Sequence, residues 1–178
     1  MTYHGPLVGE LGDPEAFDDD SLWRAVGGNG GSPLVFEFAP SQVARPGAAE
    51  GVLVGGCLSL VATLVGTAFA VPSDGTILFW EEVNEEPYRI DRMLGQLRLA
   101  GCLDRIRGMV VGRLVGCDPK DPGAGLPLRE ILDVHLGERR IPVITDFPAG
   151  HCAGKVTLPL GARARLDTAL GRLTIPGD

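Results

Sequence analysis

The chain has 178 residues, of which 44% are hydrophobic and 22% charged, with a formal net charge of −7. This composition is typical of one folded domain and excludes a disordered or collagen-like chain. The acidic balance and the lack of a basic stripe in the sequence disfavour a nucleic-acid partner, because phosphate binding requires clustered Lys and Arg.

Neither a signal peptide nor a membrane-spanning segment is expected from the sequence. Residues 1–6 lack the positive segment and apolar run of a signal peptide. The most apolar stretch, residues 51–71, is interrupted by glycines and by Ser59, Thr63 and Thr67, so we expect a buried strand and helix there. We therefore expect a cytoplasmic protein without a membrane partner.

The four cysteines, at positions 57, 102, 117 and 152, form no Cys-x-x-Cys pair. Their apolar or Gly-rich surroundings predict buried free thiols in a reducing compartment, and not a structural zinc site.

The first half of the chain begins with an extended Gly-rich segment. Acidic residues before Ser21 favour a helix start, because the positive end of the helix dipole attracts negative charge. The elements expected here are an extended segment 1–12, a helix from 18 to 27, a strand 34–38, a loop 40–50, a strand 52–54, a turn at Gly55-Gly56, and a helix 58–65.

The second half alternates strands with helices. A helix is expected to begin near Pro87, which suits a first helical turn, and to bury Ile90, Met93, Leu94, Leu97 and Leu103 at a period near 3.6. The other elements expected are strands 76–80 and 108–115, a loop 118–125, a helix 128–136, a strand 141–144, and closing strands 155–160, 164–167 and 172–175. This order predicts an α/β or mixed domain.

Polar residues follow two of the predicted strands at their carboxyl ends, where α/β proteins place functional sites. Glu81 and Glu82 follow Ile-Leu-Phe-Trp, and His151 follows Pro-Val-Ile-Thr by a short Gly-containing turn. A Glu from one strand end could orient and charge-stabilise a His from the next, as the acid does in a Ser-His-acid triad. Each residue alone also suits a solvated turn or a structural role.

A nucleophile for such a triad is not evident in the sequence. Cys152 adjoins His151, and neighbouring side chains of an extended segment point apart. Ser59 and Ser73 lack a Gly-x-Ser-x-Gly context, and Ser59 at a helix start suits a local hydrogen bond. An unrelated Cys-dependent hydrolase using Cys152 or Cys57 is the least favoured alternative.

Other polar motifs are weaker indications of a functional site. Gly55-Gly56 before a helix could cradle an anion, but it lacks a complete nucleotide-binding pattern. His4, His135 and His151 show no metal-ligand spacing, and His135 near a helix end suits a capping role. The polar residues from Tyr88 to Arg92 suit a solvated helix face.

An ordered set of segments resembles one protein family, the LD-carboxypeptidases of bacterial cell-wall recycling, which include the muramoyltetrapeptide carboxypeptidases and the microcin-immunity peptidases. The segments are Thr-Tyr-His-Gly-Pro at 2–6, Gly-Gly-Cys-Leu-Ser-Leu at 55–60, Gly66-Thr67, Gly-Thr-Ile-Leu-Phe-Trp-Glu-Glu-Val at 75–83, Tyr-Arg-Ile-Asp-Arg-Met-Leu at 88–94, Pro-Ala-Gly-His at 148–151, and Leu-Pro-Leu-Gly at 158–161.

The resemblance implies an α/β fold, the swivelling β/β/α-type C-terminal domain of an LD-carboxypeptidase, over residues 1–178, with 1–12 as a junction segment. In this family a Ser-Glu-His triad acts, and its Glu and His correspond to Glu81 and His151. The family's Ser lies in a Gly-x-Ser-Asp turn of an N-terminal domain, and that motif does not occur here. We therefore expect this chain to be inactive alone, without a nucleophile.

The implied reaction is hydrolysis of the diaminopimelate–D-Ala bond of a murein tetrapeptide, without a metal or other cofactor. Partners implied are a muropeptide substrate and the N-terminal domain, and the apolar surface that this domain covers could otherwise support a homodimer. The alternatives are one half of a microcin-immunity-type peptidase and a non-catalytic muropeptide-binding domain. The segments Glu-Glu-Val at 81–83 and Tyr-Arg-Ile-Asp-Arg-Met-Leu at 88–94 favour the murein branch.

Overall fold

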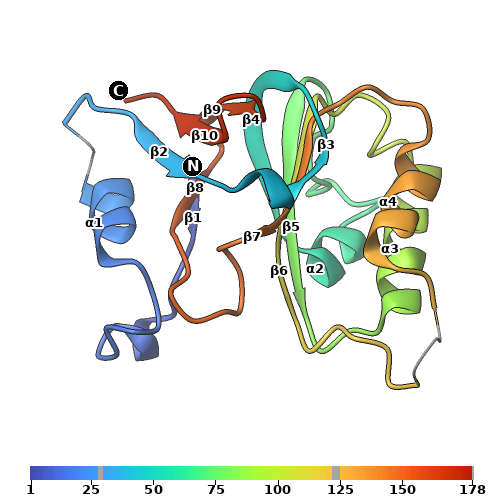
Figure 1. The fold of residues 1–178 in the computed structure, drawn as a ribbon, viewed down its shortest axis with the longest axis horizontal. Coiled ribbons are helices and arrows are strands. Elements are labelled where there is room, and N and C mark those ends of the chain that lie inside the picture. Colours follow the sequence, from blue (N-terminus) through green and yellow to red (C-terminus); the bar gives the residue numbers. More distant parts are fainter. Residues whose placement is uncertain (28–29, 122–124, 178) are drawn as a thin grey trace.

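The computed structural model describes residues 1–27, 30–121 and 125–177. An eight-stranded sheet has the order β2-β10-β9-β4-β5-β6-β7-β3, and a second sheet pairs β1 with β8 (Figure 1). The strands are β1 Thr2–His4, β2 Leu34–Glu37, β3 Val43–Arg45, β4 Ala48–Cys57, β5 Thr76–Val83, β6 Gly108–Val115, β7 Val143–Phe147, β8 Leu158–Leu160, β9 Arg163–Asp167 and β10 Arg172–Ile175. The helices are α1 Asp19–Gly27, α2 Leu58–Thr63, α3 Pro87–Leu99 and α4 Leu128–Leu136, with 3-10 turns η1 Val8–Glu10 and η2 Pro40–Gln42.

The centre of the large sheet is parallel and its flanks are antiparallel. Strands β4, β5, β6 and β7 run parallel to one another, whereas β9, β10, β2 and β3 are added antiparallel. Helices α2, α3 and α4 cover one face, and the N-terminal segment with α1, β1 and β8 lies on the other side (Figure 1). This mixed α/β architecture agrees with the predicted fold class.

Strand β5 separates two hydrophobic cores. Leu78 and Trp80 face the core under α2, α3 and α4, whereas Ile77 and Phe79 face the core on the opposite side of the sheet. Because successive side chains of a strand alternate between faces, Glu81 continues the Phe79 face and Glu82 continues the Trp80 face. The two neighbouring glutamates are thereby sent to different environments.

Elements with a strong local pattern agree with the sequence analysis. Strand β6 and helix α4 have the predicted bounds, and α1 spans Asp19–Gly27. Helix α3 begins at Pro87 and buries Ile90, Met93, Leu94 and Leu97 as predicted. It ends at Leu99, so Leu103 is buried but lies beyond the helix in which it was expected. The predicted loop 118–125 lies partly outside the described residues.

The predicted loop over residues 40–50 is wrong. This segment contains η2, β3 and the start of β4, which pairs antiparallel with β9 over Ala48–Val52 and parallel with β5 over Val52–Cys57. Its partners are distant in sequence, so the local run of Pro, Ala and Gly hides the pairing.

Several other predicted elements differ from the structure in their bounds or type. Gly55-Gly56 is not a turn but the last part of β4, and α2 ends at Thr63 instead of residue 65. Strand β5 continues through Glu81 and Glu82 to Val83. Strand β7 covers Val143–Phe147, later than predicted, and β8 is shorter than the predicted strand 155–160. The expected extended segment 1–12 is a strand only at Thr2–His4.

Replacing Gly55 by Ala should destabilise the fold more than replacing its neighbour Gly56. Both have φ values that L side chains rarely adopt, +135° and +147°, but a Cβ at Gly55 would overlap the carbonyl oxygen of Phe79, whereas Gly56 has open space. The shared backbone cost is about 1–2 kcal/mol, and overpacking at Gly55 should add about 1–3 kcal/mol. Urea unfolding of both variants measures the difference, and equal losses would contradict the close approach of β4 to β5.

Candidate active site

Glu81 is a fully buried carboxylate near the carboxyl end of β5. Glycines on two other segments make room for it: a Cβ at Gly112 would lie 2.8 Å from the Glu81 Cβ, and one at Gly150 would lie 2.6 Å from Oε2. Gly150 also has a φ of +119°, which favours glycine. The backbones of β6 and of the turn after β7 therefore close directly around the carboxylate.

His151 meets this carboxylate as the sequence predicts. Its Nδ1 lies 2.8 Å from Glu81 Oε2, and its backbone N–H donates to the same oxygen at 3.3 Å. The His151 side chain is 51% exposed, whereas that of Glu81 is 0% exposed. The pair thus has a buried acid and an imidazole that reaches solvent.

The geometry determines which ring nitrogen is available for chemistry. Because an ionised carboxylate only accepts hydrogen bonds, Nδ1 of His151 carries a proton. In the neutral ring, Nε2 then keeps its lone pair and can act as a base. A carboxylate behind Nδ1 also stabilises the imidazolium that forms when Nε2 takes up a proton.

His4 is a third member of this cluster, although no local pattern of the sequence indicates its contact with Glu81. Its Nε2 lies 3.8 Å from Glu81 Oε1, and its ring contacts Phe79 edge-on at a centroid distance of 5.0 Å. Burial lowers the pKa of His4, an effect that Glu81 opposes and that His151 and Lys155 reinforce. The segment 2–6 is one of the family-like segments, but the spacing of residues 4 and 81 in the sequence does not predict that they are in contact.

A partly buried ion pair borders the cluster. Lys155 Nζ lies 2.5 Å from Glu10 Oε1, and the Lys155 side chain is 8% exposed. The hydrogen bond from Lys155 lowers the pKa of the Glu10 carboxyl. Residues from η1 and from the turn after His151 are tied together in this way, beside the exposed face of the imidazole.

The candidate nucleophiles that the sequence offered do not reach His151. Ser59 contacts the Cys57 thiol at 3.1 Å and donates its backbone N–H to Glu82 at 2.8 Å, so its predicted local bonding is confirmed. Ser73 precedes β5 and lies at the opposite end of that strand from Glu81. Within residues 1–27, 30–121 and 125–177, no hydroxyl or thiol hydrogen-bonds to Nε2 of His151.

The thiols are unsuited to nucleophilic chemistry. Burial raises the pKa of both Cys57 and Cys152, which favours the unreactive thiol over the thiolate. All four cysteines are free, and Cys117 is buried whereas the other three are partly exposed, so the expectation of buried thiols holds in part.

Two other polar residues have structural roles. Glu82 accepts hydrogen bonds from the backbone N–H groups of Ser59 and Val83, and it thereby caps the start of α2. His135 does not cap its helix as expected: it is buried, and its Nε2 lies 2.6 Å from Asp91 Oδ1, which joins α4 to α3.

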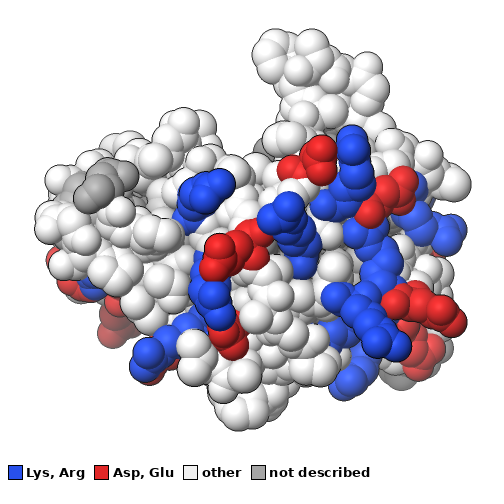
Figure 2. Space-filling model, turned by 90° about the horizontal axis from the view of Figure 1, so that it is seen from above, with Lys and Arg blue, Asp and Glu red and all other residues white. Residues whose placement is uncertain are grey.

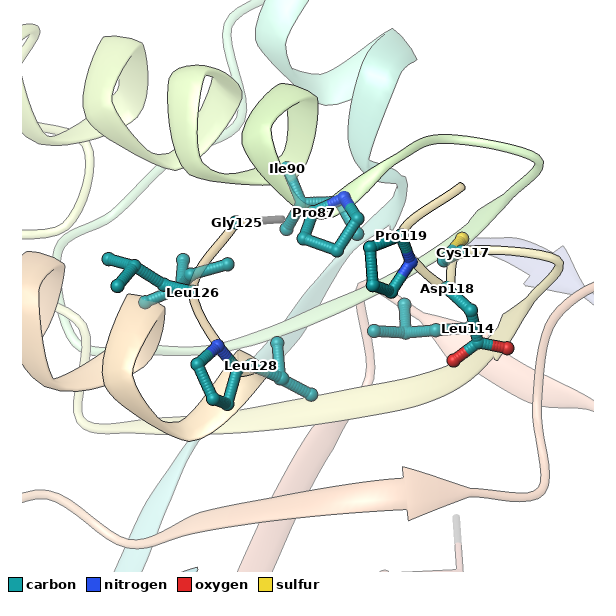
Figure 3. A pocket seen from close by; sticks show the side chains of 11 residues that line it. Pro87, Ile90, Leu114, Cys117, Asp118, Pro119, Gly125, Leu126 and Leu128 are labelled. Atoms are coloured by element: carbon teal, nitrogen blue, oxygen red, sulfur yellow. The ribbon is translucent and has the colours of Figure 1, made fainter. Parts of the chain in front are cut away.

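Two hollows lie at the carboxyl side of the sheet. A mostly apolar pocket of about 430 Å³ is formed by the starts of α3 and α4 and the end of β6, where Pro87, Leu114 and Leu128 point into it (Figure 3). Neither Glu81 nor His151 lines this pocket. A shallower hollow of about 280 Å³ does include His151, together with Glu10, Glu15, Cys152 and Lys155.

The opposite edge of the sheet carries mixed charges. Figure 2 shows basic and acidic side chains intermingled on that face, where Arg165 pairs with Glu50 and Asp167 and Arg105 pairs with Asp74. Charges arranged in this way compensate each other locally.

Among residues 1–27, 30–121 and 125–177, no helix is long and apolar enough to cross a bilayer. In those residues no group of three or more His, Cys, Asp and Glu side chains is placed to hold a metal ion.

A buried acid that orients an exposed imidazole at the carboxyl edge of an α/β sheet is typical of hydrolases with a nucleophile–His–acid triad. Comparison with known families agrees with such a site: residues 50–166 match the family described as the LD-carboxypeptidase C-terminal domain. The chain belongs to this family.

Individual relatives agree with that assignment. A Bacillus subtilis protein named a probable murein peptide carboxypeptidase is 39% identical over 172 residues, covering 95% of this chain and 54% of the relative. The crystal structure of muramoyltetrapeptide carboxypeptidase from Oxalobacter formigenes matches with a TM-score of 0.80 at 32% identity, over 99% of this chain and 61% of that chain. The chain spans about half the length of the curated relatives it matches.

The microcin branch of the family is also represented. The microcin C7 self-immunity protein MccF of Escherichia coli is 30% identical over 127 residues, covering 68% of this chain and 35% of MccF. A structure of MccF in complex with glutamyl sulfamoyl guanosine has a TM-score of 0.84 at 20% identity, over 99% of this chain and 61% of that chain. At this identity the superposition shows the shared fold.

The stability of the chain should fall on mild acidification because of His4. Its pKa in the folded chain lies below the ordinary value of 6.5, so the unfolded chain binds this proton first as the pH falls. His4 contributes fully to stability above pH 6.5, and the contribution is lost as the pH falls toward the folded pKa.

Urea unfolding between about pH 7.5 and pH 5 measures this effect, since the slope of stability against pH counts protons taken up. We expect the free energy of unfolding to fall less steeply in His4→Gln than in the parent chain. Identical slopes in the two proteins would contradict a depressed pKa at His4.

Proposed function

We propose that this chain is the C-terminal part of a serine-type LD-carboxypeptidase, in which Glu81 and His151 are two members of a Ser-Glu-His triad. The observation that carries the proposal is the 2.8 Å contact between the buried Glu81 carboxylate and Nδ1 of a half-exposed His151. The third member, a Ser, comes from a nucleophile domain outside these 178 residues. Residues 1–12 form the junction with that domain.

The proposed mechanism uses both residues in two steps. His151 Nε2 removes the proton of the Ser hydroxyl as the Ser oxygen attacks the scissile carbonyl carbon, and it then donates that proton to the departing amine of D-Ala. A water molecule attacks the acyl-enzyme, giving its proton to Nε2, and the Ser oxygen leaves with that proton. Glu81 compensates the imidazolium charge in both steps.

The proposed substrate is a murein tetrapeptide, cleaved between diaminopimelate and D-Ala in cytoplasmic peptidoglycan recycling. The names of the Bacillus subtilis and Oxalobacter formigenes relatives support this choice. Leu7 and Val8 are 71% and 86% exposed and lie beside Glu10 in the chain, and Glu10 lines the same hollow as His151. Exposed apolar side chains at this place suit a surface covered by another domain. MccF supports the alternative of a microcin-immunity-type peptidase half.

The first test is the coding DNA upstream of the Met1 codon. An in-frame segment that encodes Gly-x-Ser-Asp supports the carboxypeptidase proposal. A stop codon without such a segment nearby leaves Glu81 and His151 without a nucleophile in the same gene. It would favour the second candidate, a non-catalytic muropeptide-binding domain.

The chain alone should release no D-Ala from a murein tetrapeptide. Loss of an activated Ser and its oxyanion hole costs on the order of a million-fold in rate. Chromatographic detection of D-Ala after incubation with excess tetrapeptide checks this, and calorimetry on the same mixture tests for binding. Rapid D-Ala release by the chain alone would contradict the proposal, whereas tight binding without release would favour the muropeptide-binding domain.

In a longer protein that supplies the Ser, Glu81→Gln should lower kcat by about 10⁴-fold and His151→Gln by about 10⁶-fold. Glu81→Gln removes the charge behind Nδ1 but retains the size of the side chain. Glu37→Gln is the matched control, because Glu37 is an exposed carboxylate on the edge strand β2 that pairs with Arg172. Steady-state D-Ala release measures all three, and an active His151→Gln protein would remove His151 from the triad.

A further inference from the structure

One oxygen of the Glu81 carboxylate is left without a hydrogen bond. Oε2 accepts from the ring and the backbone of His151, whereas the buried Oε1 has no hydrogen-bond partner among the described residues. The basic group facing Oε1 is Nε2 of His4, at 3.8 Å. A buried carboxylate oxygen without a hydrogen bond costs folding free energy, and Nε2 of His4 is a possible donor to it.

The fold aims the His4 ring at this oxygen. Strand β1 pairs antiparallel with β8, with His4 opposite Leu158, which fixes the backbone at the start of the chain. The ring lies edge-on to Phe79 at 66°, and the His4 side chain is 22% exposed. Phe79 belongs to the same strand and the same face as Glu81, so one strand supplies both the support and the target of the ring.

We propose that His4 is a positioning residue that holds the Glu81 carboxylate by Oε1 and so fixes the rotation that presents Oε2 to His151. One buried carboxylate would then accept hydrogen bonds from two imidazoles, His4 at Oε1 and His151 at Oε2. A movement of about 0.6 Å brings Nε2 of His4 within donor range of Oε1. Hydrogen bonds of this kind are often long in unliganded sites and tighten when substrate binds.

The charges around His4 favour a neutral donor. Burial lowers the pKa of His4, Glu81 raises it, and His151 and Lys155 lower it further. Glu10 compensates the Lys155 charge. A neutral imidazole can donate to Oε1 without adding a positive charge that would oppose the imidazolium of His151 during catalysis.

The competing explanation is that His4 only fills space against Phe79. The two roles separate in a pair of variants. His4→Gln retains a donor amide that can reach Oε1, whereas His4→Phe retains the ring packing but removes the donor. A packing role predicts that the Phe variant behaves as the parent chain.

The test is proton NMR of this chain, observing the low-field resonance of the Nδ1–H of His151 bonded to Glu81. We expect the resonance in the parent chain and in His4→Gln, and its loss or upfield shift in His4→Phe. The proton between His135 and Asp91 serves as an internal control for folding. An unchanged His151 resonance in His4→Phe, with the His135 control intact, would overturn the positioning role.

A second measurement does not require the Phe variant to fold. The negative charge of Glu81 raises the pKa of His4, so His4 should titrate at a lower pH in Glu81→Gln than in the parent chain. An unchanged His4 pKa would overturn the proposal.

The inference concerns the same site as the proposed function, but its outcome is independent of that function. Neither NMR experiment depends on hydrolysis. A longer protein that fails to release D-Ala while the His4 effects are present counts against the carboxypeptidase proposal alone. Absent His4 effects in an active enzyme count against the positioning role alone.

Discussion

The burial of the Glu81 carboxylate is the constraint around which the site is arranged. A charged carboxylate in the middle of a sheet is unfavourable unless nearby groups compensate for its lost hydration. Three separate segments approach it: Gly112 of β6, the Gly150-His151 turn after β7, and His4 of β1. Each approach requires close packing, which explains glycine at two of these positions.

Adjacent glutamates on one strand perform unrelated tasks because the strand alternates its faces. Glu82 turns toward the helical layer and accepts the backbone N–H of Ser59 at the start of α2. Glu81 turns to the other face and meets the imidazoles. Strand β5 therefore carries both Glu82, which stabilises the start of α2, and Glu81, which orients His151. Because the two side chains lie on opposite faces, a substitution at one need not disturb the other.

The sequence predicted what depends on local pattern. Helix α3, with Pro87 at its start and an apolar stripe at helical spacing, could be placed closely, and strand β6 could be placed by its apolar run. Strand β4 could not, since its pairing with β9 and β5 joins distant segments and its sequence resembles a loop followed by a turn.

The same distinction between local pattern and distant pairing applies to the residues of the candidate site. Glu81 and His151 could be found because each lies near the carboxyl end of an apolar strand and matches a family motif. His4 had only the motif, since its position beside Glu81 depends on the pairing of β1 with β8, and that pairing spans most of the chain. A residue far from its partner in sequence, with no periodic neighbours, leaves no signal of its contact.

The arrangement also indicates how a site of this kind can be divided between two parts of a protein. The demanding step is to bury the acid and orient the ring of the histidine, and both are achieved by residues of this chain. Under the proposed function, the nucleophile comes from outside these residues and is placed over Nε2, which the half-exposed His151 ring leaves accessible. Such a partner needs to be positioned, but it need not reorganise the acid–His pair, because backbone contacts already hold that pair in place.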